Sequence, residues 1–304
     1  MYRILLAFIA LAFLSGEPAF AKRTKNAQPS APGNAVADFL QIKKIAERGN
    51  AQAQFEVGVR YTYGDGVEPD AVEAAKWYRK AAEQEHAKAQ YTLGMCYEEN
   101  RGVNKDADEA LKWHLKSAKN GYLEAMHHLG SSYLNGTIVP KDEKQGVAWF
   151  RKAADKGYLS SIAALGMCYE FGRGVDENLQ KAIEWYHKAA VRRDWDSLVK
   201  LGLFYRNGHG VPKNLRTSFG WFSQAVTSSC GSQVAHYYLG LCCQNGEGVS
   251  KNLDEAVKHF KAGLGQDKVG LKCKAALYRI HRQFPERYPI PDPADKRPRK
   301  DAAK

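Results

Sequence analysis

Apolar and polar positions follow each other through most of the chain with the spacing of amphipathic helices. Between residues 51 and 63, Ala53, Val57, Gly58 and Tyr61 fall on one face at helical spacing, and polar residues lie between them. We find no segment with the two-residue alternation that a half-buried strand needs. The pattern predicts an all-α protein.

A second apolar stripe follows the first and starts at a capping residue. Ala74, Trp77, Tyr78 and Ala81 lie on one helical face, and Asp70 stands just before them. An Asp or Asn side chain at this point accepts hydrogen bonds from the unpaired amides of the first turn. The same register holds Asp70, Asp106, Asp142, Asn178, Asn214 and Asn252. A Glu or Gln stands three residues later at Glu73, Glu109, Gln145 and Glu255, which is the spacing of a capping box.

These paired stripes recur with a fixed period. A glycine after an apolar residue stands at Gly58, Gly94, Gly130, Gly166, Gly202 and Gly240, at intervals of 36 residues and a last interval of 38. Trp77, Trp113, Trp149, Trp185 and Trp221 keep the same period, and His259 takes the sixth place. A glycine inside a helix costs about 1 kcal/mol relative to alanine. Its recurrence therefore predicts close approach of the second helix, and the period predicts six stacked helix pairs.

The fourth copy carries a family resemblance. Its strings Leu165-Gly166-Met167-Cys168-Tyr169, Gly172-Arg173-Gly174-Val175 and Lys181-Ala182-Ile183-Glu184-Trp185-Tyr186-His187-Lys188-Ala189-Ala190 resemble a complete Sel1-like repeat, a relative of tetratricopeptide repeats with a longer, glycine-containing link. The resemblance covers residues 51–269 and implies a right-handed α-solenoid (superhelix) that serves as an interaction scaffold. The third copy departs from it, because Gly136-Thr137-Ile138-Val139 lacks the second glycine. The sixth has His259-Phe260 as its aromatic pair.

The N-terminus resembles a secretory signal. Arg3 precedes the apolar run 4–14, and Ala19-Phe20-Ala21 gives the small-x-small pattern of a cleavage site. An uncleaved amphipathic anchor is the alternative, but the run lacks a polar face. We therefore expect a periplasmic or secreted protein. The predicted organisation is a signal peptide (1–21), a flexible leader (22–34), a capping helix (35–50), six repeats (51–86, 87–122, 123–158, 159–194, 195–232 and 233–269), a second capping helix (270–284) and a disordered basic tail (285–304).

The net charge bears on partners and leaves the fold prediction unchanged. The chain has 45 Lys and Arg against 33 Asp and Glu, a formal charge of +12. This excess favours acidic partners or anionic envelope polymers. The basic residues are spread over every repeat, so we do not expect nucleic acid as a partner.

Three patterns that suggest chemistry have a simpler explanation in the repeat. Ser197 and Lys200 match the serine-x-x-lysine motif of penicillin-binding enzymes and β-lactamases, but Ser197 takes the small-residue position of Ala53 in the first copy. His127 and His128 are adjacent on a helix and point in different directions, and no Cys, Asp or Glu stands at partnering spacing. The turn glycines resemble those of phosphate-binding loops, but because they recur along the chain we expect them to serve the fold. We expect no catalytic residue, no metal and no cofactor.

The six cysteines leave one disulfide open. Cys96 and Cys168 lie two repeats apart, farther than the roughly 7 Å that a disulfide spans between Cα atoms, so we expect them to be buried thiols. One bridge among the C-terminal cysteines stays open; these are Cys230, Cys242, Cys243 and Cys273.

Function is therefore expected on the concave side, where first helices of successive repeats present variable positions. The predicted partner-binding residues are Glu56, Tyr63, Thr92, Glu99, His128, Asn135, Phe171, Lys200, Asn207, Tyr238 and Asn245. We expect a monomer that binds another protein as an adaptor or regulator in the bacterial envelope. A secreted virulence or host-interaction factor is the alternative, and a cell-wall or β-lactam hydrolase acting through Ser197 is a third.

Overall fold

The computed structural model describes residues 32–227 and 232–289, and every regular element in these ranges is an α-helix. The N-terminal helices are α2 (Pro32–Glu47), which precedes the repeats, α3 (Ala51–Tyr63), α4 (Ala71–Glu83), α5 (Ala87–Glu98), α6 (Ala107–Lys119), α7 (Leu123–Asn135), α8 (Glu143–Asp155) and α9 (Leu159–Phe171). The later helices are α10 (Leu179–Val191), α11 (Trp195–Asn207), α12 (Leu215–Thr227), α13 (Gln233–Asn245), α14 (Leu253–Ala262) and α15 (Lys268–Gln283). The predicted signal peptide, most of the leader and most of the basic tail lie outside the described residues.

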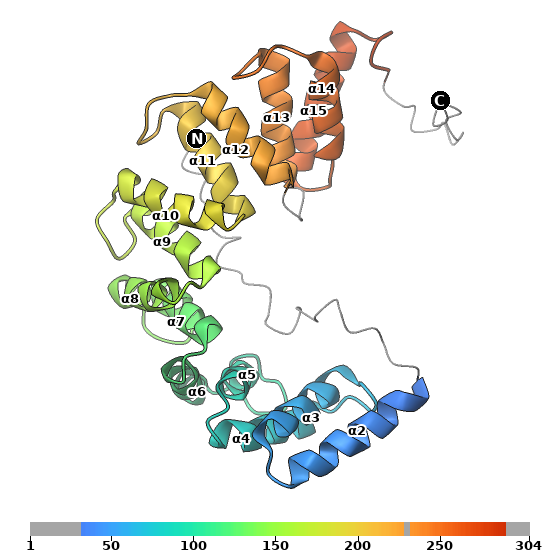
Figure 1. Cartoon of the computed structure of the whole chain (residues 1–304), viewed down its shortest axis with the longest axis vertical. Coiled ribbons are helices and arrows are strands. Elements are labelled where there is room, and N and C mark those ends of the chain that lie inside the picture. The colour runs from blue at the N-terminus through green and yellow to red at the C-terminus, as the bar shows by residue number, and fades with distance from the viewer. Residues whose placement is uncertain (1–31, 228–231, 290–304) are drawn as a thin grey trace. The chain divides into compact units, whose positions relative to one another are not determined.

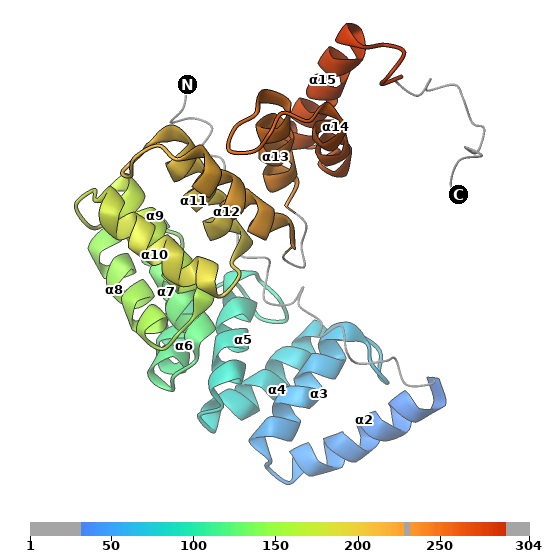
Figure 2. The same cartoon turned by 45° about the horizontal axis from the view of Figure 1, so that its top comes forward.

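The chain divides into two compact units, residues 1–185 (unit 1) and 186–304 (unit 2). In unit 1 the helices pack as consecutive pairs, α3 with α4, α5 with α6 and α7 with α8, and each pair contacts the next. Figures 1 and 2 both show α3 beside α4 and α7 beside α8. Figure 1 shows α5, α7 and α9 on one side of this unit and α6 and α8 on the other. In unit 2, α11 packs with α12 and α13 with α14, and α15 covers α13 and α14.

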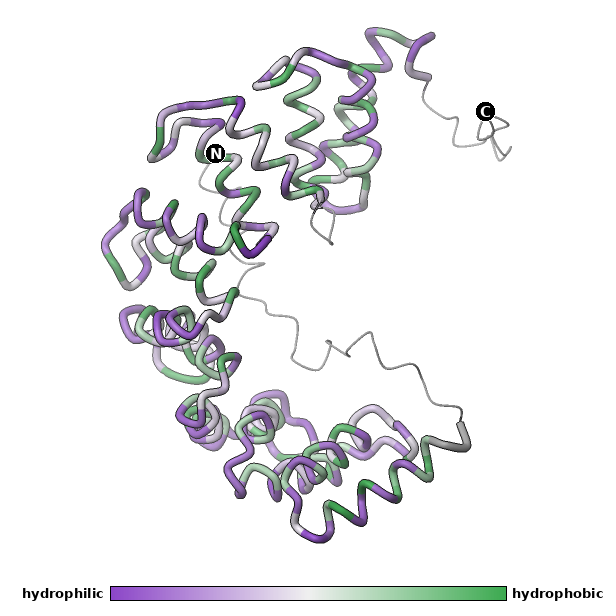
Figure 3. Tube along the Cα trace, in the orientation of Figure 1, coloured by the Kyte–Doolittle hydropathy of each residue, from purple (hydrophilic) through white to green (hydrophobic). Residues whose placement is uncertain are grey.

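The core forms because each helix carries both apolar and polar residues. Figure 3 shows the two kinds following each other along the helices instead of separating into different elements. In unit 1, one cluster joins Phe55, Tyr78, Leu93 and Trp113, which come from four consecutive helices. The hydrophobic core is therefore continuous from the first repeat to the second, as a stacked architecture requires. None of the described helices combines the length and the apolar character needed to cross a membrane.

The recurring glycine of the first helix makes room for an aromatic ring of the second. A Cβ atom on Gly130 would lie 2.5 Å from Cδ1 of Phe150, and one on Gly202 would lie 2.4 Å from Cε1 of Phe222. Both rings are fully buried. Carbon atoms cannot approach so closely, which confirms that the glycines mark close helix contacts.

All six predicted caps form. Asp142, for example, accepts a hydrogen bond from the Gln145 N–H at 3.0 Å, and Asn214 accepts one from Thr217 at the same distance. The others are Asp70, Asp106, Asn178 and Asn252.

The predicted reciprocal capping box is wrong. The backbone N–H of each cap residue donates instead to the carbonyl of the tyrosine position in the last turn of the first helix, as Asp70 does to Tyr61 at 2.9 Å. The Glu73 side chain is left to pair with Lys76 at 2.6 Å. The sixth repeat keeps the backbone bond with Cys243 in place of tyrosine, because only the carbonyl is needed.

The second glycine has a positional role in the links that contain it. Gly174 has φ +71°, and a Cβ there would lie 2.1 Å from the Glu143 carbonyl oxygen of the preceding repeat. The link therefore contacts the start of the preceding second helix through bare backbone, which only glycine permits.

Candidate interaction face and a polar cluster

Most of the predicted binding positions in unit 1 lie at the solvent-accessible surface. Tyr63, at the end of α3, is 46% exposed, and Glu99 and Asn135 at the equivalent places are also exposed. Glu56, His128 and Phe171 are half-buried. We call Glu56, Tyr63, Glu99, His128, Asn135 and Phe171 the first-helix face.

Two predicted positions are not open. Thr92 is only 9% exposed, and its hydroxyl donates to the Lys88 carbonyl at 2.9 Å. Lys200, in unit 2, is 3% exposed. The expectation that packing leaves these side chains free is therefore wrong for both. The repeat period determines where each residue lies on the backbone, but the size of the neighbouring side chains determines whether its side chain is buried.

The other predicted residues of unit 2 lie near the surface. Asn207 and Asn245 are exposed. Tyr238 is half-buried, and its ring stacks on Phe222 with centroids 5.0 Å apart and planes at 10°. The Arg206 guanidinium lies 5.5 Å from the Tyr238 ring centroid, an arrangement suited to a cation–π contact. Tyr238 is therefore held in one orientation by its own unit.

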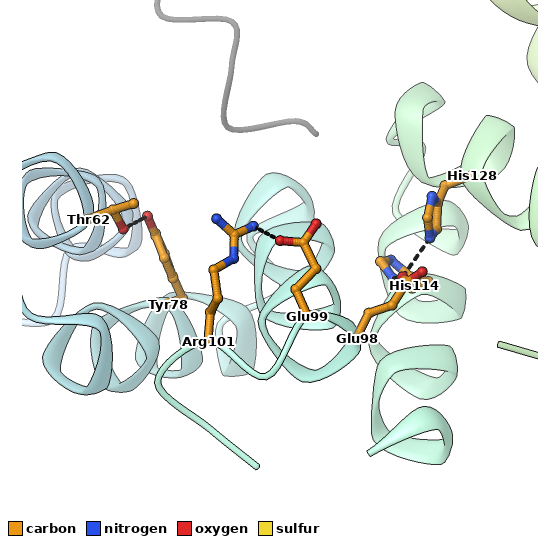
Figure 4. Close-up of polar contacts among 7 residues, drawn as sticks. All are labelled: Thr62, Tyr78, Glu98, Glu99, Arg101, His114 and His128. Carbon is orange, nitrogen blue, oxygen red and sulfur yellow. Dashed lines mark hydrogen bonds and ion pairs between the residues drawn. The ribbon is translucent and has the colours of Figure 1, made fainter. Parts of the chain in front are cut away.

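Charged residues on the first-helix face are paired within the chain. The carboxylate of Glu56 lies 3.6 Å from the Arg60 guanidinium, and Glu99 forms an ion pair with Arg101 (Figure 4). Arg101 also lines a hollow of about 350 Å³ between the first and second repeats. Its other walls are Tyr61, Thr62, Pro69, Asp70, Ala71, Ala74, Tyr78 and Cys96. Aromatic, acidic and basic walls together suit a side chain with both apolar and polar parts.

Next to this face, three polar side chains from two repeats converge. Glu98 ends α5, His114 lies in α6 and His128 in α7, and Figure 4 shows both imidazoles directed at the Glu98 carboxylate. The Glu98 Oε2 atom lies 2.8 Å from His128 Nε2 and 3.3 Å from His114 Nε2. The two imidazole centroids are 4.5 Å apart. We call Glu98, His114 and His128 the Glu98 cluster.

Burial and hydrogen bonding shift the pKa values of His114 and Glu98 in this cluster. His114 is fully buried, and desolvation lowers its pKa to about 4, so the ring is neutral at pH 7. Burial alone raises the pKa of Glu98, but hydrogen bonds from His114 and His128 outweigh it and hold that pKa well below its usual range. At neutral pH an ionised carboxylate therefore accepts from two imidazole N–H groups.

Sequence reasoning missed this cluster. The prediction that His127 and His128 diverge is confirmed, since His127 Nδ1 lies 3.0 Å from the Ser161 hydroxyl and His128 reaches Glu98. The expectation that no carboxylate partners them is wrong, because Glu98 comes from the preceding repeat, 30 residues away. A signal was present in the sequence. His114 takes the position that holds Tyr78 and Phe150 in neighbouring repeats.

Comparison with protein families agrees with this architecture. The profile described as the Sel1 repeat matches residues 51–86, 87–122, 123–158, 159–190, 195–229 and 233–263. The chain belongs to the Sel1 repeat family. The predictions of this family and of an all-α solenoid of six repeats are thereby confirmed.

Two solved structures of Sel1 repeat proteins resemble this chain. One is a protective antigen of uropathogenic Escherichia coli strains displaying an SLR fold, 31% identical over 81% of this chain, with a TM-score of 0.71. This chain covers 56% of that protein's length. The other is a Sel1 repeat protein from Oxalobacter formigenes, 27% identical over 77% of this chain and 98% of its own, with a TM-score of 0.63. Among curated proteins, none matches the sequence.

The serine motif of this Sel1 repeat protein is part of its packing. Ser197 is fully buried, and its backbone N–H donates to the Asp194 cap at 2.9 Å. Alanine fills the same position in other repeats, as Ala89 and Ala125 do, and both are fully buried. A substrate carbonyl has no access to the Ser197 hydroxyl in this arrangement.

The cysteines of the described residues are free thiols. Cys96, Cys168, Cys242, Cys243 and Cys273 are all buried and unbridged. Burial raises the pKa of Cys168 to about 12 and that of Cys96 to about 11, so both stay protonated and unreactive. Cys230 lies outside the described residues.

Proposed function

We propose that this Sel1 repeat protein is a scaffold that binds another protein through its first-helix face. The observation that supports this most directly is the exposure of Tyr63, Glu99 and Asn135, which take one repeated position at the C-terminal ends of α3, α5 and α7. The buried residues around them are needed for packing, whereas these side chains vary in type and remain exposed. Successive exposed positions on stacked helices form the kind of extended surface with which repeat proteins bind partners.

Tyr63 is the best candidate for a residue that dominates affinity. Interface energy concentrates in a few residues, and tyrosine is enriched among them. Tyr63 is a large ring that is almost half exposed, and it stands at the end of the same helix that supplies Tyr61 and Thr62 to the hollow. A partner that covers Tyr63 can therefore also place a side chain in that hollow.

For the cellular role, we propose an adaptor or regulator in the bacterial envelope. The apolar run 4–14 and the Ala19-Phe20-Ala21 pattern support export, and the net charge of +12 favours acidic proteins or anionic polymers there. A role in host interaction is the second candidate. It is favoured by the similarity to the E. coli protein, which is described as a protective antigen of uropathogenic strains.

Site-specific photocrosslinking in living cells tests the binding face. A photoreactive residue at Glu99, on the first-helix face, should crosslink to one recurrent protein, while the same residue at Lys119, exposed at the end of α6, should not. Crosslinks from Lys119 alone would contradict the proposal. Cell fractionation then separates the two roles, because an adaptor stays in the periplasm and a host factor appears in the medium.

A further inference from the structure

The Glu98 cluster presents the donor set of a transition-metal site. Two imidazole nitrogens and one carboxylate oxygen lie within 4.8 Å of one another. Histidine nitrogen and carboxylate oxygen are ordinary ligands of Zn²⁺, at about 2.0–2.2 Å from the metal. Around such an ion, tetrahedral ligands stand about 3.4 Å apart. The His114–Glu98 separation of 3.3 Å already fits, and the His128–Glu98 separation of 2.8 Å has to open only slightly.

Packing orients the two imidazoles before any ligand arrives. His114 lies against Gly94, where a Cβ would be 2.7 Å from its Cε1 atom, so the ring is confined on that side. Tyr91 contacts both rings, with centroids 5.3 Å from His114 and 5.9 Å from His128. Ligands that are held in place in this way lose little freedom when they bind a metal.

The repeat itself does not require these residues. In the first repeat the positions of Glu98 and His114 hold Thr62 and Tyr78, whose hydroxyls share one hydrogen bond at 2.8 Å (Figure 4). Three other repeats fill the position of His114 with a hydrocarbon ring: Phe150, Phe222 and Phe260.

His114 also buries a polar atom that the fold leaves unsatisfied. The side chain is fully buried, and its Nδ1 atom has no hydrogen-bond partner. Burying a polar atom in this way costs free energy, which a phenylalanine avoids. Packing alone therefore does not favour an imidazole at this place, whose Nε2 atom faces Glu98 Oε2 instead.

We propose that Glu98, His114 and His128 bind a divalent transition-metal ion, with Zn²⁺ as the reference ion. When the metal binds, the proton on each Nε2 atom shifts to Nδ1, so that both imidazoles become ligands beside the Glu98 carboxylate. A fourth position stays open to water or to a side chain of a bound protein. Solvent reaches the site, because the side chains of Glu98 and His128 are each 21% exposed. His128 also belongs to the first-helix face, so the ion lies beside the surface that we propose for partner binding. The metal site does not depend on that function.

Titration of the full chain with Zn²⁺ against a chromophoric chelator tests the site. We expect one high-affinity ion per chain. Three variants replace the ligands with residues that other repeats already carry at the same positions: Glu98→Gln as at Gln244, His114→Phe as at Phe150, and His128→Ala as at Ala164. Each should lower the affinity at least tenfold, since even outer residues of metal sites contribute about 10–100-fold.

A second histidine pair provides the matched control. His236 and His259 lie in unit 2, with Nδ1 atoms 3.1 Å apart, and the other repeats carry Trp at the position of His259. The His259→Trp variant should bind Zn²⁺ as the wild type does. Binding that survives all three cluster variants, or that is lost in His259→Trp, would overturn the assignment. So would the absence of any stoichiometric ion.

Cobalt gives a readout that does not depend on the variants. Co²⁺ in a site with two imidazoles and a carboxylate should produce visible absorption bands in the wild-type chain, and Zn²⁺ should displace them in a one-to-one titration. Bands that are absent, or that need several equivalents of Zn²⁺ to disappear, would contradict a single site.

Discussion

The backbone N–H of Asp142 donates to the Tyr133 carbonyl at 2.8 Å and ties the end of α7 to the start of α8. The same bond recurs in every repeat, from the cap residue of the second helix to the tyrosine position of the first. It satisfies one carbonyl that the end of a helix leaves open. It also takes the N–H that a capping box would have used, so the Glu or Gln three residues later has no such role.

The caps therefore depend on one side chain. Asp142→Ala removes the acceptor for the Gln145 N–H and should destabilise the protein by about 1 kcal/mol. Gln145→Ala should leave stability nearly unchanged, because Gln145 is exposed and the Asp142 N–H bonds elsewhere. Urea denaturation, with hydrogen exchange of the α8 amides, measures both. An equal loss of stability in the two variants would show that the capping box does form.

The close contact at Gly202 makes a second prediction. Gly202→Ala should destabilise by about 1–3 kcal/mol, because the new methyl would overlap the fully buried Phe222 ring. Gly220→Ala in α12 should instead stabilise by up to about 1 kcal/mol, since no atom lies within 4 Å of the added methyl and alanine favours a helix. Chemical denaturation of both variants should give opposite signs. Stabilisation in both variants would mean that the Phe222 ring moves aside for the new methyl.

Asp196 in α11 should make stability depend on pH. Burial, together with the nearby Asp194 carboxylate, raises its pKa from 3.8 to about 7. The folded state therefore binds the proton more tightly than the unfolded state, and stability falls as the pH rises from about 4 to 7. Asp196→Asn should remove this loss and stabilise the protein above pH 7, by at most about 4 kcal/mol.

Melting curves between pH 4 and 8 test this prediction. The wild type and Asp196→Asn should be closest at pH 4 and diverge as the pH rises. Asp254→Asn is the control, because Asp254 is exposed and hydrogen bonds from Tyr288 and Arg287 lower its pKa. That variant should not gain stability at high pH. Parallel curves for the wild type and Asp196→Asn would show that Asp196 keeps an ordinary pKa.

The features that recur in every repeat could be predicted from the sequence. Gly130 and Asp142 stand at fixed intervals from their counterparts in the other repeats, so each needed an explanation that applies to all six copies. The predicted close helix contact at Gly130 and the predicted helix cap at Asp142 are both confirmed. The capping box does not form, because the Tyr133 carbonyl accepts the hydrogen bond from the Asp142 N–H that the Gln145 side chain would have accepted. That hydrogen bond depends on how the link folds, which side-chain spacing does not show.

The features that occur once could not be predicted in the same way. Glu98, His114 and His128 are separated by 16 and 14 residues and meet only because two repeats stack. Thr92 occupies the same position of its repeat as His128, yet it is buried, since local neighbours decide coverage. For the same reason the period located the first-helix face but did not show which of its positions are open.

The central claim is that the first-helix face recognises a protein, and binding affinity tests it most directly. The protein captured by crosslinking from Glu99 would be titrated by calorimetry into the wild type, Tyr63→Ala and Lys119→Ala. We predict at least a tenfold weaker affinity for Tyr63→Ala, about 1.4 kcal/mol, and no change for Lys119→Ala. Unchanged affinity in Tyr63→Ala together with a loss in Lys119→Ala would contradict it.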